Sequence, residues 1–166
     1  MSRLAAALLE RGISVARFNF PYREQGSRRP DPMPVLRARY EAVVQQVRGE
    51  GRLVIGGRSM GGRVASMMAA DGFACDGLLL VAYPLHPAGQ PEKLRDAHLP
   101  RIKVPVLCMN GTRDALCRRD LMERAVGNLP GWDMRWLEGA DHSLAKESEL
   151  REIADAAAAW MNSGSE

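Results

Sequence analysis

The sequence is poor in the residues that mark several kinds of binding protein. Aromatic residues make up only 5% of its 166 residues, and the one arginine-rich stretch, residues 23–39, contains none on which bases could stack. Acidic and basic residues nearly balance, at 20 against 23. Such a balance rarely accompanies nucleic-acid binding, so we expect no nucleic-acid partner and interpret the arginine-rich stretch as a solvated face.

Cysteines and long apolar runs are equally scarce. The chain contains three cysteines, Cys75, Cys108 and Cys117. An odd number without CxxC spacing indicates reduced thiols in a cytoplasmic protein and gives no sign of a metal site. No run approaches the roughly 18 to 20 apolar residues of a membrane helix. The run at residues 4–9 is too short for a signal peptide, so we expect a soluble protein with no membrane partner.

What the sequence does have is concentrated in residues 53–70. Three β-favouring apolar residues lead into four glycines that bracket Ser59, and apolar residues at helical spacing follow. This pattern predicts a strand, a tight turn and a helix, which is the context of a nucleophile elbow. Gly57 and Gly61, two residues before and after the serine, would keep the strand and the helix from colliding.

The rest of the chain alternates between apolar strands and amphipathic helices. Strands are predicted at 13–20, 52–57, 77–83, 104–110 and 134–137, and helices at 3–11, 35–47, 60–70, 91–97, 120–127 and 148–161. Nearly continuous apolar strands indicate an α/β fold with a parallel sheet covered by helices on both faces. We expect one domain over residues 1–166, with residues 162–166 as a frayed tail.

Three polar residues follow three of these strands, where a parallel sheet carries its functional side chains. Ser59 follows the elbow strand, Asp114 the strand at 104–110, and His142 the strand at 134–137. A serine hydroxyl needs a base to become a nucleophile, and His142 would be that base. Asp114 would hold the imidazole in the required tautomer. Asp141 is the rival acid, but we favour Asp114 because Asp141 adjoins the histidine.

Each of these residues also has a simpler interpretation. Ser59 would only cap a helix, and His142 would only be a surface histidine, if the three did not act together. His86 and His98 have no matched acid and are interpreted as loop-packing or pocket-lining residues. Cys117 has no basic partner and is interpreted as an unreactive thiol. A phosphate site is not favoured, since the glycines fit neither a P-loop nor the GxGxxG spacing.

Several short sequence motifs are similar to those of a known group of enzymes. They are ARFNFPY (16–22), GGRSMGGRVASM (56–67), YPLHPAG (83–89), PEKLRDAHLP (91–100), NGTRD (110–114) and GADHS (139–143). These strings resemble the small lidless α/β hydrolases of the dienelactone-hydrolase-like group. The closest likeness is to the branch of testis-expressed protein 30 and the hydrolase-like subunit of a chromatin acetyltransferase complex.

This resemblance implies an α/β-hydrolase fold without a large lid. It also implies a catalytic Ser59, His142 and Asp114 that act without a cofactor on a small ester, thioester or related acyl compound. The backbone N–H of Met60 would be one donor of the oxyanion hole. The other reading, from a different class, is an inactive hydrolase-like scaffold that binds a protein partner.

The chain departs from this family at its start. Members of the family place a strand and a His-Gly turn before the helix that here opens at Met1. The strand would lie between those at 13–20 and 52–57, and its turn would supply the second oxyanion donor, whose loss costs about 10² to 10³ in turnover. We therefore expect an N-terminally truncated fold with impaired activity. Either the flanking strands pair directly or a partner chain, such as a second copy, fills the exposed edge. The alternative is a natural start further upstream, or a fragment.

Overall fold

The computed structural model describes residues 1–163. Its centre is a parallel sheet of four strands in the order β1-β2-β3-β4. The strands are β1 (Val54–Arg58), β2 (Gly77–Val81), β3 (Val106–Gly111) and β4 (Trp132–Leu137). All four were predicted from their apolar runs, with bounds within two residues of those observed. β3 is buried along its whole length, as expected for a central strand covered on both faces.

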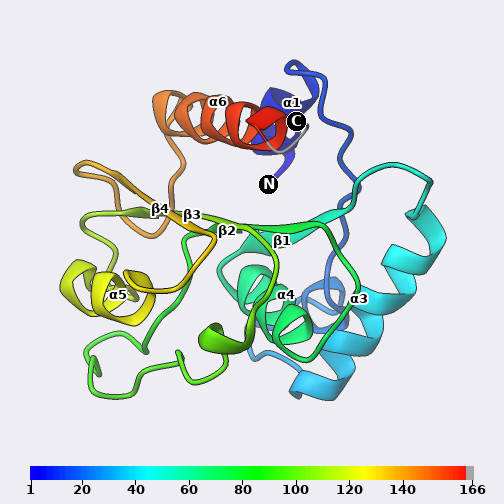
Figure 1. The fold of residues 1–166 in the computed structure, drawn as a ribbon. Helices are drawn as coiled ribbons and strands as arrows, with labels where there is room; N and C mark the ends of the chain where they lie inside the picture. The colour runs from blue at the N-terminus through cyan, green and yellow to red at the C-terminus, as the bar shows by residue number, and fades with distance from the viewer. Residues whose placement is uncertain (164–166) are drawn as a thin grey trace.

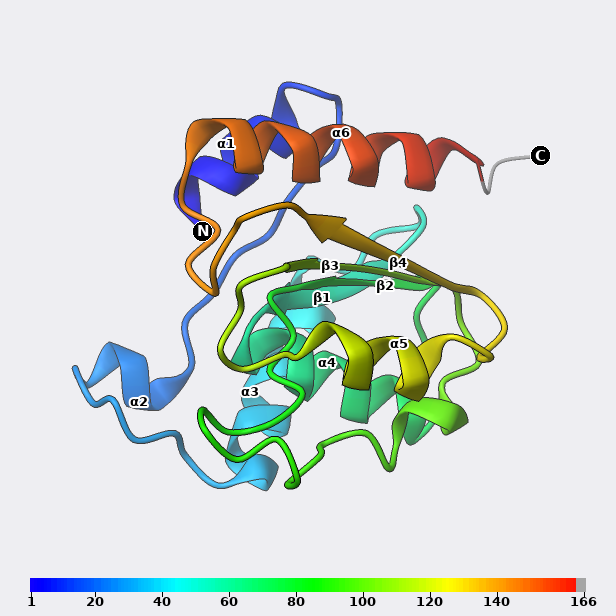
Figure 2. The ribbon, with the colours of Figure 1, turned by 90° about the vertical axis from the view of Figure 1, so that its left-hand side faces the viewer.

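Helices cover both faces of the sheet. They are α1 (Ser2–Leu9), α2 (Pro21–Glu24), α3 (Met33–Val47), α4 (Met60–Ala70), α5 (Arg119–Val126) and α6 (Glu147–Ser163). Figure 1 shows α1 and α6 together on one face and α3, α4 and α5 on the other, and Figure 2 shows the same layers from the side. Each face has its own apolar core, and the two cores sandwich the sheet. No helix within residues 1–163 has the length and apolar character needed to cross a membrane.

The strand predicted at residues 13–20 is wrong. This segment forms no strand and pairs with no neighbour, and most of its side chains are exposed. An isolated extended segment has no partner for its backbone groups, so its apolar pattern alone cannot make it a strand. Direct pairing with β1, which we expected as one way to close the sheet, does not occur.

Two helix predictions also need correction. Residues 91–97 form turns instead of a helix, because the Arg95 N–H donates to the distant Leu85 carbonyl oxygen (2.7 Å) in place of a helical bond. The helical turn of this segment is the short 3-10 helix η1 (Leu99–Arg101). At the other end of the chain, residues 162 and 163 belong to α6 and are not frayed; residues 164–166 lie outside the described residues.

At Gly56, the outer edge of β1 is covered by a side chain instead of a strand. The Tyr40 hydroxyl, from α3, donates to the Gly56 carbonyl oxygen (2.6 Å) and accepts from the Gly56 N–H (2.8 Å). The Tyr40 ring packs edge-on against Phe18, with their centroids 5.0 Å apart. Burial raises the pKa of Tyr40 to about 12, so the hydroxyl keeps the proton it donates. Tyr40 thus satisfies two backbone groups that would otherwise stay open on this edge.

Replacing Tyr40 by phenylalanine is expected to destabilise the fold by ~2 kcal/mol, because both Gly56 groups lose their partner while the ring stays. Thermal unfolding followed by circular dichroism should show a melting temperature lower by roughly 4 to 8 °C. Tyr22→Phe is the matched control, since the Tyr22 hydroxyl belongs to the same aromatic cluster and has no partner within residues 1–163. Equal losses in the two variants would contradict the role given to Tyr40.

Candidate active site

Ser59 lies at a sharp turn between β1 and α4. Its backbone has φ 54° and ψ −117°, a conformation that residues other than glycine rarely adopt and that costs about 1–3 kcal/mol. The turn is held from both sides, because the Ser59 N–H donates to the Val81 carbonyl oxygen (2.9 Å) and the Arg63 N–H donates to the Ser59 carbonyl oxygen (3.0 Å). The strand, turn and helix predicted from the glycine pattern are therefore present.

The glycines around Ser59 differ in whether there is space for a Cβ atom. A Cβ on Gly57 would lie 2.7 Å from the Gly61 carbonyl carbon, and one on Gly62 would lie 2.7 Å from the Gly57 carbonyl oxygen. A Cβ on Gly61 would meet nothing within 4 Å. The close approach of strand and helix therefore depends on Gly57 and Gly62, and Gly61 contributes only its backbone.

The structure brings Ser59, His142 and Asp114 together, although they come from three separate loops. His142 Nε2 lies 2.9 Å from Ser59 Oγ, and His142 Nδ1 lies 2.8 Å from Asp114 Oδ2 and 3.0 Å from Oδ1. A carboxylate can only accept, so the proton between them is assigned to Nδ1. This leaves Nε2 free to accept a proton from the serine hydroxyl.

Asp114 is fixed in place by its own surroundings. Its side chain is 0% exposed, against 28% for that of His142. The Leu116 N–H donates to Asp114 Oδ1 (2.8 Å), and Asn110 Nδ2 donates to Oδ2 (3.4 Å). The carboxylate therefore has partners besides His142, as a buried charge requires.

The rival acid, Asp141, bonds to Ser143 and forms no hydrogen bond with the imidazole within residues 1–163. Its Oδ1 accepts from both the N–H (2.8 Å) and the hydroxyl (2.5 Å) of Ser143, and these bonds lower the pKa of Asp141. Asp141 shapes the loop that carries His142, and the hydrogen bonds of the imidazole go to Asp114 and Ser59.

Arg58, next to the nucleophile, also reaches the histidine loop. One of its guanidinium nitrogens donates to the His142 carbonyl oxygen (3.1 Å). The contact ties the end of β1 to the loop after β4 and helps hold the imidazole near Ser59. The role of Arg58 was not predicted, because nothing in the local sequence pattern indicates where a long side chain will end.

A second Ser–His pair lies deeper on α4, where Ser66 Oγ is 2.8 Å from His98 Nε2. Ser66 is fully buried and donates its proton to the Arg63 carbonyl oxygen (2.8 Å), so the proton is not directed at the histidine. Burial, aided by the charges of Arg63 and Arg101, lowers the pKa of His98 to about 4. No carboxylate bonds to His98 in residues 1–163, and this pair is poorly suited to nucleophilic catalysis.

The remaining candidate residues, His86 and Cys117, pack within the loops. His86 Nδ1 lies 2.9 Å from the Pro87 carbonyl oxygen, and its Nε2 accepts from the Arg118 N–H (3.1 Å). Burial raises the pKa of Cys117 to about 12, which keeps it a thiol. Within the described range 1–163, no three His, Cys, Asp or Glu side chains are grouped to hold a metal ion.

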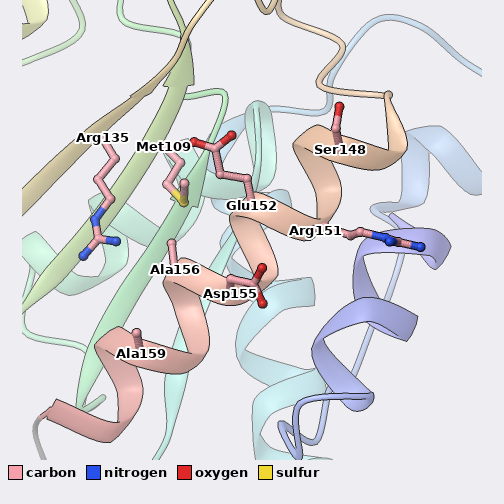
Figure 3. A pocket seen from close by; sticks show the side chains of 8 residues that line it. All are labelled: Met109, Arg135, Ser148, Arg151, Glu152, Asp155, Ala156 and Ala159. Carbon is pink, nitrogen blue, oxygen red and sulfur yellow. The ribbon is translucent and has the colours of Figure 1, made fainter.

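A hollow of about 520 Å³ lies elsewhere, between α6 and the sheet (Figure 3). It is lined by Met109, Arg135, Ser148, Arg151, Glu152, Asp155, Ala156 and Ala159. Three of its charged side chains already have partners: Arg135 pairs with Asp133, Arg151 with Glu147, and Asp155 with Arg11. None of the residues around Ser59 lines it, so it is separate from the candidate active site.

Solved structures share this fold. A serine hydrolase homologue from Coxiella burnetii is 23% identical, with a TM-score of 0.75 over 95% of this chain and 74% of its own. A monoacylglycerol lipase from Paleococcus ferrophilus is 15% identical, with a TM-score of 0.74 over 98% and 88%. A serine hydrolase without a lid from Xanthomonas campestris is 23% identical, with a TM-score of 0.70 over 93% and 68%. Residues 1–163 match the family described as alpha/beta hydrolase domain, and the chain therefore belongs to that family.

Proposed function

We propose that the protein is a serine hydrolase that cleaves an ester, thioester or related acyl compound. The observation that carries this proposal is the continuous chain of contacts from Ser59 Oγ through His142 to the buried Asp114 carboxylate. Membership of the alpha/beta hydrolase family supports hydrolase chemistry in general, and the strained turn at Ser59 supports this serine as the nucleophile.

The geometry supports a two-stage reaction. Ser59 Oγ attacks the carbonyl carbon of the substrate while its proton moves to His142 Nε2. The tetrahedral intermediate collapses as His142 gives this proton to the leaving group, which departs and leaves an acyl-serine. A water molecule then repeats the sequence and releases the acid. Asp114 stabilises the imidazolium in each stage and stays ionised.

Met60 would stabilise the negative oxygen of the intermediate. It is the first residue of α4, and the first N–H groups of a helix have no acceptor within the helix. The position directly after the nucleophile is the one that supplies an oxyanion donor in this fold. The turnover rate depends on how many such N–H donors form hydrogen bonds to the negative oxygen of the intermediate.

A fluorophosphonate probe tests the proposal directly, since it labels only an activated serine. We expect covalent labelling of the wild-type protein at Ser59, shown by peptide mass spectrometry, and no labelling of Ser59→Ala. Ser66→Ala is the matched control and should label like the wild type, because the second Ser–His pair lacks an acid.

Folded protein that resists the probe would overturn the catalytic proposal and leave the inactive scaffold in its place.

Two narrower proposals rest on features of the sequence. The branch of testis-expressed protein 30 is supported by the motif strings, and a cytoplasmic location is supported by the three free cysteines.

A further inference from the structure

The side-chain amide of Asn110, at the end of β3, joins the loop after β2 to the candidate acid. Asn110 is 0% exposed. Its Oδ1 accepts from the Tyr83 N–H (3.0 Å), and its Nδ2 donates to the Tyr83 carbonyl oxygen (3.1 Å) and to Asp114 Oδ2 (3.4 Å). Both hydrogens of the amide are therefore used, one on the backbone of Tyr83 and one on the Asp114 carboxylate.

Tyr83 is a fixed anchor for this amide. β2 ends at Val81, and the chain leaves the sheet at Ala82, whose φ of 51° lies in the left-handed region. After this kink the Tyr83 N–H has no backbone acceptor within residues 1–163, and Asn110 provides one. Tyr83 is fully buried, and its hydroxyl donates to the Arg95 carbonyl oxygen (2.9 Å). The amide is thus bound to a backbone segment that is itself held in place.

The partners of the amide also determine which way it faces. The Tyr83 N–H can only donate, so it meets Oδ1, and Nδ2 then lies at the end that meets two acceptors. His142 Nδ1 approaches the same carboxylate oxygen, Asp114 Oδ2, to 2.8 Å. The other oxygen, Oδ1, accepts from the Leu116 N–H (2.8 Å). Each oxygen of the carboxylate therefore has a partner besides the imidazole.

We propose that Asn110 is a positioning residue for the reaction, which holds the Asp114 carboxylate in the orientation that the His142 imidazole requires. This inference rests on the proposed function. Asn110 forms no hydrogen bond with Ser59 or His142 in residues 1–163, so it acts through Asp114. Catalysis is sensitive to such an arrangement, because a misplacement of about 1 Å can cost ~10²-fold in rate. A bridge that only joined Tyr83 to β3 would stabilise the fold without acting on Asp114.

Asn110→Ala removes the amide and tests this role. We expect kcat for p-nitrophenyl acetate to fall about 10- to 100-fold, with KM within about twofold of the wild type, because the amide does not bind the substrate. The melting temperature should also fall, since the buried Tyr83 N–H loses its partner. Cys108→Ala is the matched control. Cys108 is also fully buried on β3 and lies 3.5 Å from Asn110 Oδ1, but it forms no hydrogen bond with Asp114 within residues 1–163, so kcat should stay within about twofold of the wild type.

A double-mutant cycle separates positioning from stability. Asn110→Ala should slow fluorophosphonate labelling of Ser59 about 10- to 100-fold in the wild-type background, but less than about twofold in the Asp114→Ala background. Its effect on the melting temperature should appear in both. An equal loss of rate in the two backgrounds, or an unchanged kcat in folded Asn110→Ala, would overturn the positioning role and leave the proposed function standing. Wild-type protein that shows neither labelling nor turnover would overturn both.

A measurement on the wild type covers the case in which Asn110→Ala does not fold. Fluorophosphonate modification of Ser59 removes the hydroxyl that His142 Nε2 contacts, and so changes the hydrogen bonding between the imidazole and Asp114. The side-chain amide NMR signals of Asn110 should shift on modification, whereas those of Gln45, exposed on α3, should not. Asn110 signals that stay in place would contradict the positioning role.

Discussion

Asp114→Asn is expected to lower the turnover of p-nitrophenyl acetate by about 10⁴-fold. An amide at this position can donate to His142 Nδ1, which would move the imidazole proton to Nε2 and prevent it from accepting the Ser59 proton. It would also leave the imidazolium without a negative partner in a buried place. The measurement is kcat at pH 7.5 for the purified variant, with its folding checked by circular dichroism.

Asp141→Asn is the matched control for this prediction. Both aspartates adjoin the histidine loop, but Asp141 binds Ser143 and is exposed, so its variant should keep kcat within a few-fold of the wild type. Comparable losses in the two variants, or a nearly normal rate in Asp114→Asn, would show that the acid has been assigned incorrectly.

Gly57→Ala is expected to destabilise the fold by ~3 kcal/mol and to abolish labelling of Ser59. The added Cβ would meet backbone atoms, 2.7 Å from the Gly61 carbonyl carbon and 2.9 Å from Gly62 N, and backbone cannot rotate aside as a side chain can. The strand and helix must separate, which moves the serine. Thermal unfolding should show a melting temperature lower by roughly 6 to 12 °C.

Gly61→Ala is the counterpart of this variant, and sequence reasoning alone would expect it to behave in the same way. The space beside Gly61 is open and the residue is helical, so alanine should leave the fold as stable or up to ~1 kcal/mol more stable. Its labelling by the probe should persist. A strongly destabilised Gly61→Ala together with a Gly57→Ala as stable as the wild type would mean that the turn is packed differently.

Sequence patterns predicted the features that depend on local chemistry. Apolar runs predicted β2 and β3, because a strand buried on both faces has few other compositions. Ser59, Asp114 and His142 could be proposed as a set because the ends of parallel strands meet at one edge of the sheet. The structural features that were not predicted depend on contacts with residues far away in the chain. Residues 13–20 have the pattern of a strand without a neighbour to pair with.

The contacts of long side chains were not predicted, for a related reason. Tyr40 is one residue of the helix predicted at 35–47, and nothing in that pattern indicates that its hydroxyl bonds to Gly56 on β1. Arg58 and Arg63 appeared only as charges within a glycine-rich string, and their partners, or the lack of one, depend on the folded loops around them. Contacts of this kind join residues far apart in the chain, which no window of sequence contains.

The position of α1 has a consequence for synthesis of the chain. The apolar face of this helix packs on α6, and the two are joined by Arg3–Glu147 and Arg11–Asp155, pairs separated by 144 residues. At about 5–20 residues per second, the ribosome needs roughly 7 to 30 s between making the two helices. During that interval the stripe of Leu4, Ala7 and Leu8 has no cover. Helix α1 is thus made long before the helix that buries it, and a nascent chain would present its apolar stripe to chaperones until α6 has been made.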